Sequence, residues 1–63
     1  MIDNLKAVRK ARGMTQQELA DAANINRVTI AKYELGQIDP TLESARKMAD
    51  ALGVTIDELV KGA

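Results

Sequence analysis

Four times along its 63 residues, this chain places a residue that ends a helix shortly before residues that begin another one. The terminating residues are Gly13, Asn24, Gly36 and Gly53. Glycine, and less readily asparagine, adopts the left-handed conformation that closes a helix. No stretch of the chain alternates between apolar and polar residues as a strand does. The order of these helix-ending and helix-starting residues therefore predicts five short helices and an all-α fold.

The expected helix starts carry capping signals. Thr15 with Glu18, and Thr55 with Glu58, match the T-x-x-E capping box. Asn26 is a residue of the type that favours the N-cap. The expected helices are Asp3–Arg12, a second from Thr15 through Ala23, Arg27–Leu35, a fourth after Thr41 that stops at Gly53, and a fifth after Thr55 that stops at Gly62.

The apolar residues fall on one face of every expected helix, with three-and-four spacing. In the fourth helix the residues expected to point inward are Leu42, Ala45, Met48, Ala49 and Leu52. Most apolar side chains are aliphatic or small, and Tyr33 is the only aromatic one. A chain of this length has room for a single domain. We therefore expect one compact core and one domain over residues 1–63.

Composition argues against an enzyme. The chain has no cysteine and no histidine, so the commonest general base, thiol nucleophile and zinc ligands are missing. We expect no cofactor and no metal. Asp57 and Glu58 are the nearest approach to a carboxylate cluster, and both suit the start of a helix. No apolar run approaches the roughly 20 residues that span a bilayer, and the first residues do not resemble a signal peptide. We expect a cytoplasmic protein of bacterial or phage origin.

The nine basic and nine acidic residues give a net charge of zero, but they are unevenly distributed. Residues 1–33 hold six basic and three acidic residues, and residues 34–63 hold three basic and six acidic ones, so the halves carry +3 and −3. Such a chain is expected to be dipolar. A polyanion can approach the positive half, although ordinary solvated helix faces would give the same count.

The short turn Asn24–Asn26 between the second and third helices suits two helices that cross steeply. In such a unit the second helix can enter the major groove of DNA. The exposed positions of this helix are expected to be Arg27, Val28, Ala31 and Lys32.

The exposed side chains suit base recognition. Arg27 can form two hydrogen bonds with guanine, Val28 can contact a thymine methyl group, and Lys32 can reach a base or a phosphate. Each cation also has a plainer interpretation as a solvated surface charge.

Three further residues are candidates for contacts with the DNA backbone. Gln16 lies at the start of the second helix, where backbone N–H groups and the helix dipole favour a phosphate. Asn26 and Thr29 can donate to phosphates beside the groove, although Asn26 is equally explained as a helix cap.

From Leu5 to Leu59 the sequence resembles the phage-repressor and Cro-like helix-turn-helix family, which has the lambda-repressor-like fold. The matching segments are Leu5, Arg9, Gly13–Gln16, Glu18–Ala20, Asn24–Asn26, Thr29–Ile30, Tyr33–Gly36, Pro40–Leu42 and Ala51–Val54. The resemblance implies five helices, with the second and third forming the DNA-reading unit. It places Gln16, Asn26, Arg27, Val28 and Lys32 at DNA-contacting positions, with Gln17 and Thr29 next.

The resemblance also implies an ion pair between Arg9 and Glu34, which we interpret as structural. Two features depart from the family pattern. Asn24 stands where the family usually has glycine, and the loop Gln37–Asp39 lacks the cations that relatives often have there. The second departure predicts a shallow dependence of DNA affinity on salt.

The favoured hypothesis is a sequence-specific regulator of transcription, a repressor, that binds duplex DNA. One domain offers few base contacts, so we expect a homodimer on a pseudo-palindromic operator. The contact between the two copies is expected near the fifth helix and the C-terminus, through Ile56, Val60 or the loop before them. The net charge of zero and the acidic loop leave an alternative open: a protein-interaction module, such as an antitoxin or an adaptor, with weak or no DNA binding. A helical scaffold without a ligand is a third possibility.

Overall fold

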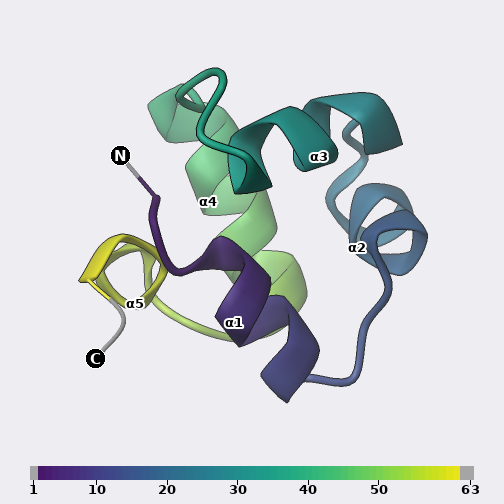
Figure 1. Ribbon diagram of the computed structural model, residues 1–63. Coiled ribbons are helices and arrows are strands. Elements are labelled where there is room, and N and C mark those ends of the chain that lie inside the picture. The colour runs from purple at the N-terminus through teal and green to yellow at the C-terminus, as the bar shows by residue number, and fades with distance from the viewer. Residues whose placement is uncertain (1, 62–63) are drawn as a thin grey trace.

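The computed structural model describes residues 2–61 and contains five helices in the order that the sequence predicts (Figure 1). The helices are α1 (Leu5–Ala11), α2 (Gln16–Ala23), α3 (Arg27–Glu34), α4 (Leu42–Leu52) and α5 (Ile56–Lys61). None of them is long and apolar enough to cross a membrane. The expected stop of the last helix at Gly62 lies outside the described residues.

The four predicted stop residues all have positive φ angles. Gly13, Gly36 and Gly53 have φ of 69°, 73° and 70°, and Asn24 has φ of 56°. Asn24 ends α2 in the left-handed conformation, and its N–H donates to the carbonyl oxygen of Asp21 over 3.3 Å. Asparagine is the side chain that best tolerates this conformation after glycine. The turn between α2 and α3 therefore forms without a glycine.

The predicted capping residues also do what their sequence pattern indicates. At α2, the Thr15 hydroxyl accepts from the Glu18 N–H over 3.0 Å, and the Glu18 carboxylate accepts from the Thr15 N–H over 2.8 Å. Thr55 and Glu58 make the same two bonds before α5. Asn26 caps α3, since its Oδ1 accepts from the Val28 N–H over 2.8 Å. Each cap satisfies backbone N–H groups that have no partner inside the helix.

Each helix contributes one fully buried large side chain to the core. These side chains are Leu5, Leu19, Ile30, Met48 and Leu59. The helix α2 packs against α3 and α4, while α5 packs against α1 and α4. The core is thus shared by all five helices, which is why none of them is expected to be stable alone at these lengths.

Some helix ends differ from the sequence-based prediction. The helix α1 begins at Leu5, not at Asp3, and ends at Ala11, one residue before Arg12. Asn4 instead ties the start of the chain to α5: its N–H donates to the carbonyl oxygen of Leu59 over 3.0 Å, and its side-chain amide donates to that of Glu58 over 3.1 Å. The helix α3 ends at Glu34, one residue early, a difference within the usual uncertainty of helix ends.

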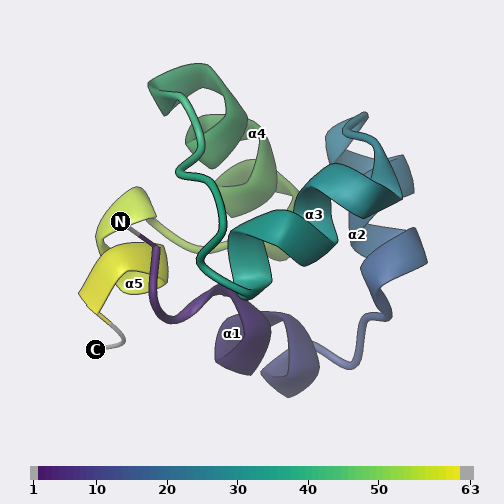
Figure 2. The ribbon, with the colours of Figure 1, turned by 45° about the horizontal axis from the view of Figure 1, so that its top comes forward.

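The prediction that Leu42 points into the core is wrong, because 68% of its surface is exposed. The spacing to Ala45 and Met48 continues the inward face of α4. However, Leu42 is the first residue of α4 and follows directly on the α3–α4 loop (Figures 1 and 2), and the inward face of the helix is buried only from Ala45 onward. Periodicity marks a face of a helix but not the point at which the neighbouring helices stop covering it.

The left-handed conformation of Asn24 generates a prediction about stability. Asn24→Ala should lower the free energy of unfolding by about 1 kcal/mol, because alanine is strained at positive φ. Asn24→Gly should stay within about 0.5 kcal/mol of the parent chain. Urea denaturation of the three chains, followed by circular dichroism, measures both effects. Equal destabilisation by glycine and alanine would contradict this explanation of the turn.

Candidate nucleic-acid interface

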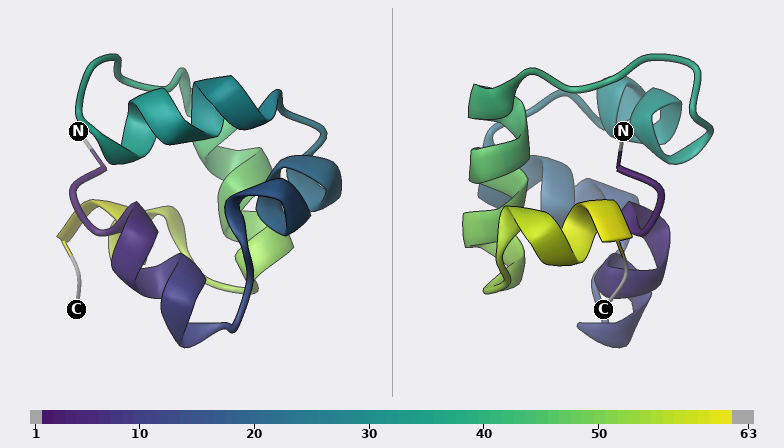
Figure 3. Two further views of the ribbon diagram at one scale, coloured as in Figure 1. Left: turned by 45° about the vertical axis from the view of Figure 1, so that its right-hand side comes forward. Right: turned by 90° about the vertical axis from the view of Figure 1, so that its left-hand side faces the viewer.

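The helix α3 lies along the outer edge of the molecule, and no other helix of residues 2–61 packs on its outer face (Figure 3). Its inner face carries the buried side chains Ile30 and Tyr33. The helices α2 and α1 pack against it from within. The α2–α3 pair therefore has the arrangement in which one helix supports a second helix that is open to solvent.

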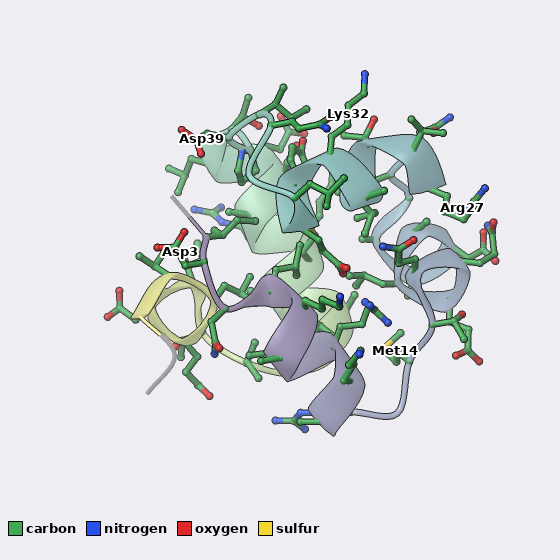
Figure 4. The ribbon with its side chains drawn as sticks, viewed as in Figure 1. Asp3, Met14, Arg27, Lys32 and Asp39 are labelled. Carbon is green, nitrogen blue, oxygen red and sulfur yellow. The ribbon has the colours of Figure 1, made fainter. Side chains whose placement is uncertain are left out.

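The structure exposes most of the residues predicted to contact DNA. Those classed as exposed are Gln17, Asn26, Arg27, Val28 and Lys32, and those that are half-buried are Gln16 and Thr29. Arg27 and Lys32 point away from the body of the molecule (Figure 4). Within the described residues, neither of these two cations takes part in an ion pair. Ala31, also predicted to be exposed, is half-buried.

The predicted pair of Arg9 and Glu34 is present and joins α1 to the end of α3. Arg9 Nε donates to Glu34 Oε2 over 2.6 Å, and Arg9 Nη2 donates to Glu34 Oε1 over 3.1 Å. Arg9 Nη1 also donates to the carbonyl oxygen of Met14 over 2.8 Å. The exposed fractions of the two side chains are only 9% and 3%. Such a bidentate geometry fixes direction as well as distance.

Gln16 is a third member of this cluster, and its contact with Glu34 was not predicted from the sequence. Its Nε2 donates to Glu34 Oε1 over 3.0 Å, so the first residue of α2 is also bonded to the end of α3. The two residues are 18 positions apart, and no local pattern indicates the contact. The cluster Arg9–Gln16–Glu34 therefore links three helices. The side-chain amide of Gln16, expected to add a phosphate contact, is in this structure directed to Glu34.

The cluster shifts the acidity of both charged groups. The hydrogen bond with Glu34 raises the pKa of Arg9, which keeps its charge. Burial alone would raise the pKa of Glu34, but the hydrogen bonds from Arg9 and Gln16 and the positive charges of Arg9 and Lys6 outweigh it. The pKa of Glu34 is therefore lower than usual, and its carboxylate is ionised at neutral pH.

An open hollow lies between the α1–α2 turn, the start of α2 and the start of α3. Its lining includes Lys10, Met14, Thr15, Gln16, Gln17 and Arg27. The first backbone N–H groups of α2 have no partner within the helix, and the positive end of the helix dipole lies there. Three cationic residues line the same hollow: Arg9, which is paired with Glu34, and Lys10 and Arg27. Its electrostatics therefore suit an anion.

Two more of the residues predicted to contact DNA, besides Gln16, already form hydrogen bonds within the protein. Asn26 uses its side-chain oxygen as the α3 cap. Gln17 donates from Nε2 to Asp21 Oδ1, one turn along α2, over 2.9 Å. Neither interaction uses every polar atom of the side chain. Among residues 2–61, no group of three or more carboxylate, histidine or cysteine side chains is arranged to hold a metal ion.

Comparison with known families identifies the class of protein that this architecture defines. Residues 5–59 match a family model described as helix-turn-helix. The match covers all five helices except the last residues of α5. The chain belongs to this helix-turn-helix family, as its resemblance to phage repressors implies.

Individual relatives agree with this assignment. The chain is 40% identical over 60 residues, 95% of its length, to the uncharacterized HTH-type transcriptional regulator YonR, derived from the SPbeta prophage, in Bacillus subtilis strain 168. It is 44% identical over 57 residues, 90% of its length, to the cryptic phage CTXphi transcriptional repressor RstR of Vibrio cholerae. It is 38% identical over 56 residues, 89% of its length, to the immunity repressor protein of Bacillus phage phi105. It spans 56%, 51% and 39% of these relatives' own lengths.

The lowered pKa of Glu34 generates a prediction about pH. A carboxylate with a lowered folded-state pKa stabilises the fold above its unfolded-state pKa, about 4.3 for a glutamate, and this stabilisation is lost as the pH falls through the folded-state value. Glu34→Gln should lower the free energy of unfolding at pH 7 by about 3 kcal/mol, because it leaves the Arg9 charge buried without its counterion. When the pH is lowered from 7 into the acidic range, the free energy of unfolding of this variant should fall less than that of the parent chain.

Urea denaturation at several pH values measures this difference. Glu43→Gln is the matched control, because Glu43 pairs with Lys47 over 3.7 Å at the surface and its side chain is 80% exposed. The control should follow the parent chain at every pH. An acid transition in Glu34→Gln as steep as that of the parent chain would refute the assigned role of the Glu34 carboxylate.

Proposed function

We propose that this chain is the DNA-binding domain of a transcription regulator and that it reads duplex DNA with α3 in the major groove. The observation that carries the proposal is the position of α3. Its inner side is held by the core and by the Arg9–Gln16–Glu34 cluster, and its outer side is uncovered and carries Arg27 and Lys32. A single helix fits the major groove.

The start of α3 supplies the base contacts in this proposal. Arg27 forms two hydrogen bonds with a guanine, and Val28 contacts a thymine methyl group. Lys32 lies one turn further along the same side and contacts a base or a phosphate. Thr29 is half-buried beside them, so its hydroxyl suits a contact with the backbone at the edge of the groove.

The hollow at the start of α2 supplies a backbone contact. A phosphate placed there accepts hydrogen bonds from the backbone N–H groups of Gln16 and Gln17 and lies near Lys10 and Arg27. The amide nitrogen of Asn26 serves a neighbouring phosphate. The α3–α4 loop adds Asp39 and no cation, and Asp39 lies well apart from Arg27 (Figure 4). Few phosphates are therefore neutralised, and the dependence of affinity on salt is shallow.

The regulator acts as a homodimer in this proposal. Two copies related by a two-fold axis read a pseudo-palindrome whose half-sites lie about one helical turn apart. Ile56 and Val60 on α5 are half-buried, so each leaves some apolar surface for a second copy. Because two of the relatives described above are named repressors, the proposed effect is repression, by occupying DNA that polymerase needs.

One property favours a second candidate function. The net charge is zero, which is unusual for a domain whose affinity depends on phosphate contacts. In this second candidate function, the same fold serves as a protein-interaction module, and the outer face of α3 is not required for DNA binding. Substitutions on that face therefore separate the two functions.

The test is selection of bound sites from a random duplex library near physiological salt. The parent chain should enrich a motif with two-fold symmetry, and Arg27→Ala/Lys32→Ala should lose it. Arg27→Ala alone should relax the preference at one position and weaken binding by about 1–3 kcal/mol.

Arg46→Ala/Lys47→Ala is the matched control, because it removes the same charge from exposed positions of α4. It should enrich the motif of the parent chain. If the parent chain is folded but enriches no motif, or if both double variants lose it equally, α3 is not the reading helix.

A further inference from the structure

The first residue of α2 belongs to two parts of the proposed interface at once. Gln16 lines the hollow that suits a phosphate, and its backbone N–H is one of the first of α2, which have no acceptor in the helix itself. Its side-chain amide is bonded to the end of α3, because Nε2 donates to Glu34 Oε1 over 3.0 Å. Gln16 is therefore the residue at which the hollow and α3 are joined.

Arg9 joins the same two parts from α1. It lines the hollow, and its guanidinium donates both to Glu34 and, from Nη1, to the carbonyl oxygen of Met14 over 2.8 Å. Met14 lies in the α1–α2 turn and also lines the hollow. The wall of the hollow and the anchor of α3 are thus made of the same residues. These bonds therefore determine how far a phosphate in the hollow lies from the end of α3.

The side-chain amide of Gln16 is more useful to Glu34 than to a phosphate. The Glu34 carboxylate is ionised and its side chain is only 3% exposed. Turning the amide toward DNA would remove one hydrogen bond from this buried charge, and bonds to charged groups are the stronger ones. A phosphate in the hollow can bond to backbone N–H groups of α2 without this loss. The backbone of Gln16 therefore suits the DNA contact, and its side chain suits the contact with α3.

We propose that Gln16 is a positioning residue: its side-chain amide holds α3 in place relative to the phosphate contact, and it contributes to base specificity without touching a base or a phosphate. This inference rests on the proposed function. Lys32 lies two positions before Glu34, so a shift at the end of α3 moves it directly. Base contacts require placement to within about 0.5 Å, whereas non-specific binding depends on phosphate contacts alone. Loss of the amide should therefore affect specific binding and spare non-specific binding.

The test compares the affinity for a duplex selected from the random library with the affinity for an unrelated duplex of the same length. Gln16→Met removes the amide and keeps an unbranched side chain that favours a helix. Its affinity for the selected duplex should fall by about fivefold, the effect of one hydrogen bond. Its affinity for the unrelated duplex should not change, so the ratio of the two affinities falls by the same factor. Thermal unfolding of each variant is measured in parallel.

Two control variants show what other roles would look like. Lys10 lines the hollow beside the proposed phosphate, so Lys10→Gln should weaken both affinities by the same factor and keep their ratio. Gln37 is an exposed glutamine of the α3–α4 loop, outside the cluster. Gln37→Met makes the same chemical change as Gln16→Met and should alter neither affinity.

Carbon-13 nuclear magnetic resonance of the Glu34 carboxyl group measures whether the effect is transmitted through Glu34. The hydrogen bond from Gln16 is one of the causes that lower the pKa of Glu34. That pKa should therefore be higher in Gln16→Met than in the parent chain and unchanged in Gln37→Met. An equal pKa of Glu34 in Gln16→Met and in the parent chain would contradict the inference.

The outcomes separate this inference from the function on which it rests. If Gln16→Met weakens both affinities by the same factor, as Lys10→Gln does, the amide of Gln16 is a phosphate contact. If Gln16→Met lowers thermal stability but keeps the ratio, the amide serves the fold alone. Either result overturns the inference and leaves the proposed function standing. If the parent chain binds both duplexes equally well, the proposed function fails together with the inference.

Discussion

The ion pair between Arg9 and Glu34 is the interaction on which the arrangement of the first three helices depends. A buried charge is strongly destabilising unless a partner neutralises it and hydrogen bonds satisfy its remaining atoms. Both requirements are met only when the end of α3 lies against α1 and against the first residue of α2, because the bonds come from Arg9 and Gln16. A shift of α3 along its axis would leave these charges unpaired. The pair therefore specifies one position of α3, whatever it adds to stability.

This constraint explains how so small a protein can have its reading helix at the surface. Each helix contributes one fully buried large side chain, so the core is small, and Ile30 is the contribution of α3. A helix with only Ile30 and Tyr33 buried would be loosely placed if burial alone held it. The cluster bonds the end of α3 to α1 and α2 from the inner side, and the Asn26 cap stabilises the first turn of α3 itself. The outer side is then left uncovered for a ligand.

The sequence predicted those features that depend on neighbouring residues. Capping boxes, positive-φ turns and helix order arise within a few residues, so they can be recognised locally. The prediction failed where contacts between distant segments of the chain determine the structure. Leu42 is exposed although Ala45, one turn further along α4, is buried, and the start of the chain before α1 is bonded to α5 through Asn4. Among the site residues, exposure of Arg27, Val28 and Lys32 was predictable from helical spacing. The bond from Gln16 to Glu34 was not, because it joins two helices whose distance only the whole fold determines.

The most direct measurement of the central claim is isotope-filtered nuclear magnetic resonance of the chain bound to a selected duplex. It detects which protein protons lie within a few ångströms of which DNA protons. The account predicts contacts from Val28 and neighbouring α3 protons to major-groove protons, such as thymine methyl groups and cytosine H5. Contacts that come only from α4 or α5, or that reach only minor-groove protons, would contradict the claim that α3 reads the major groove.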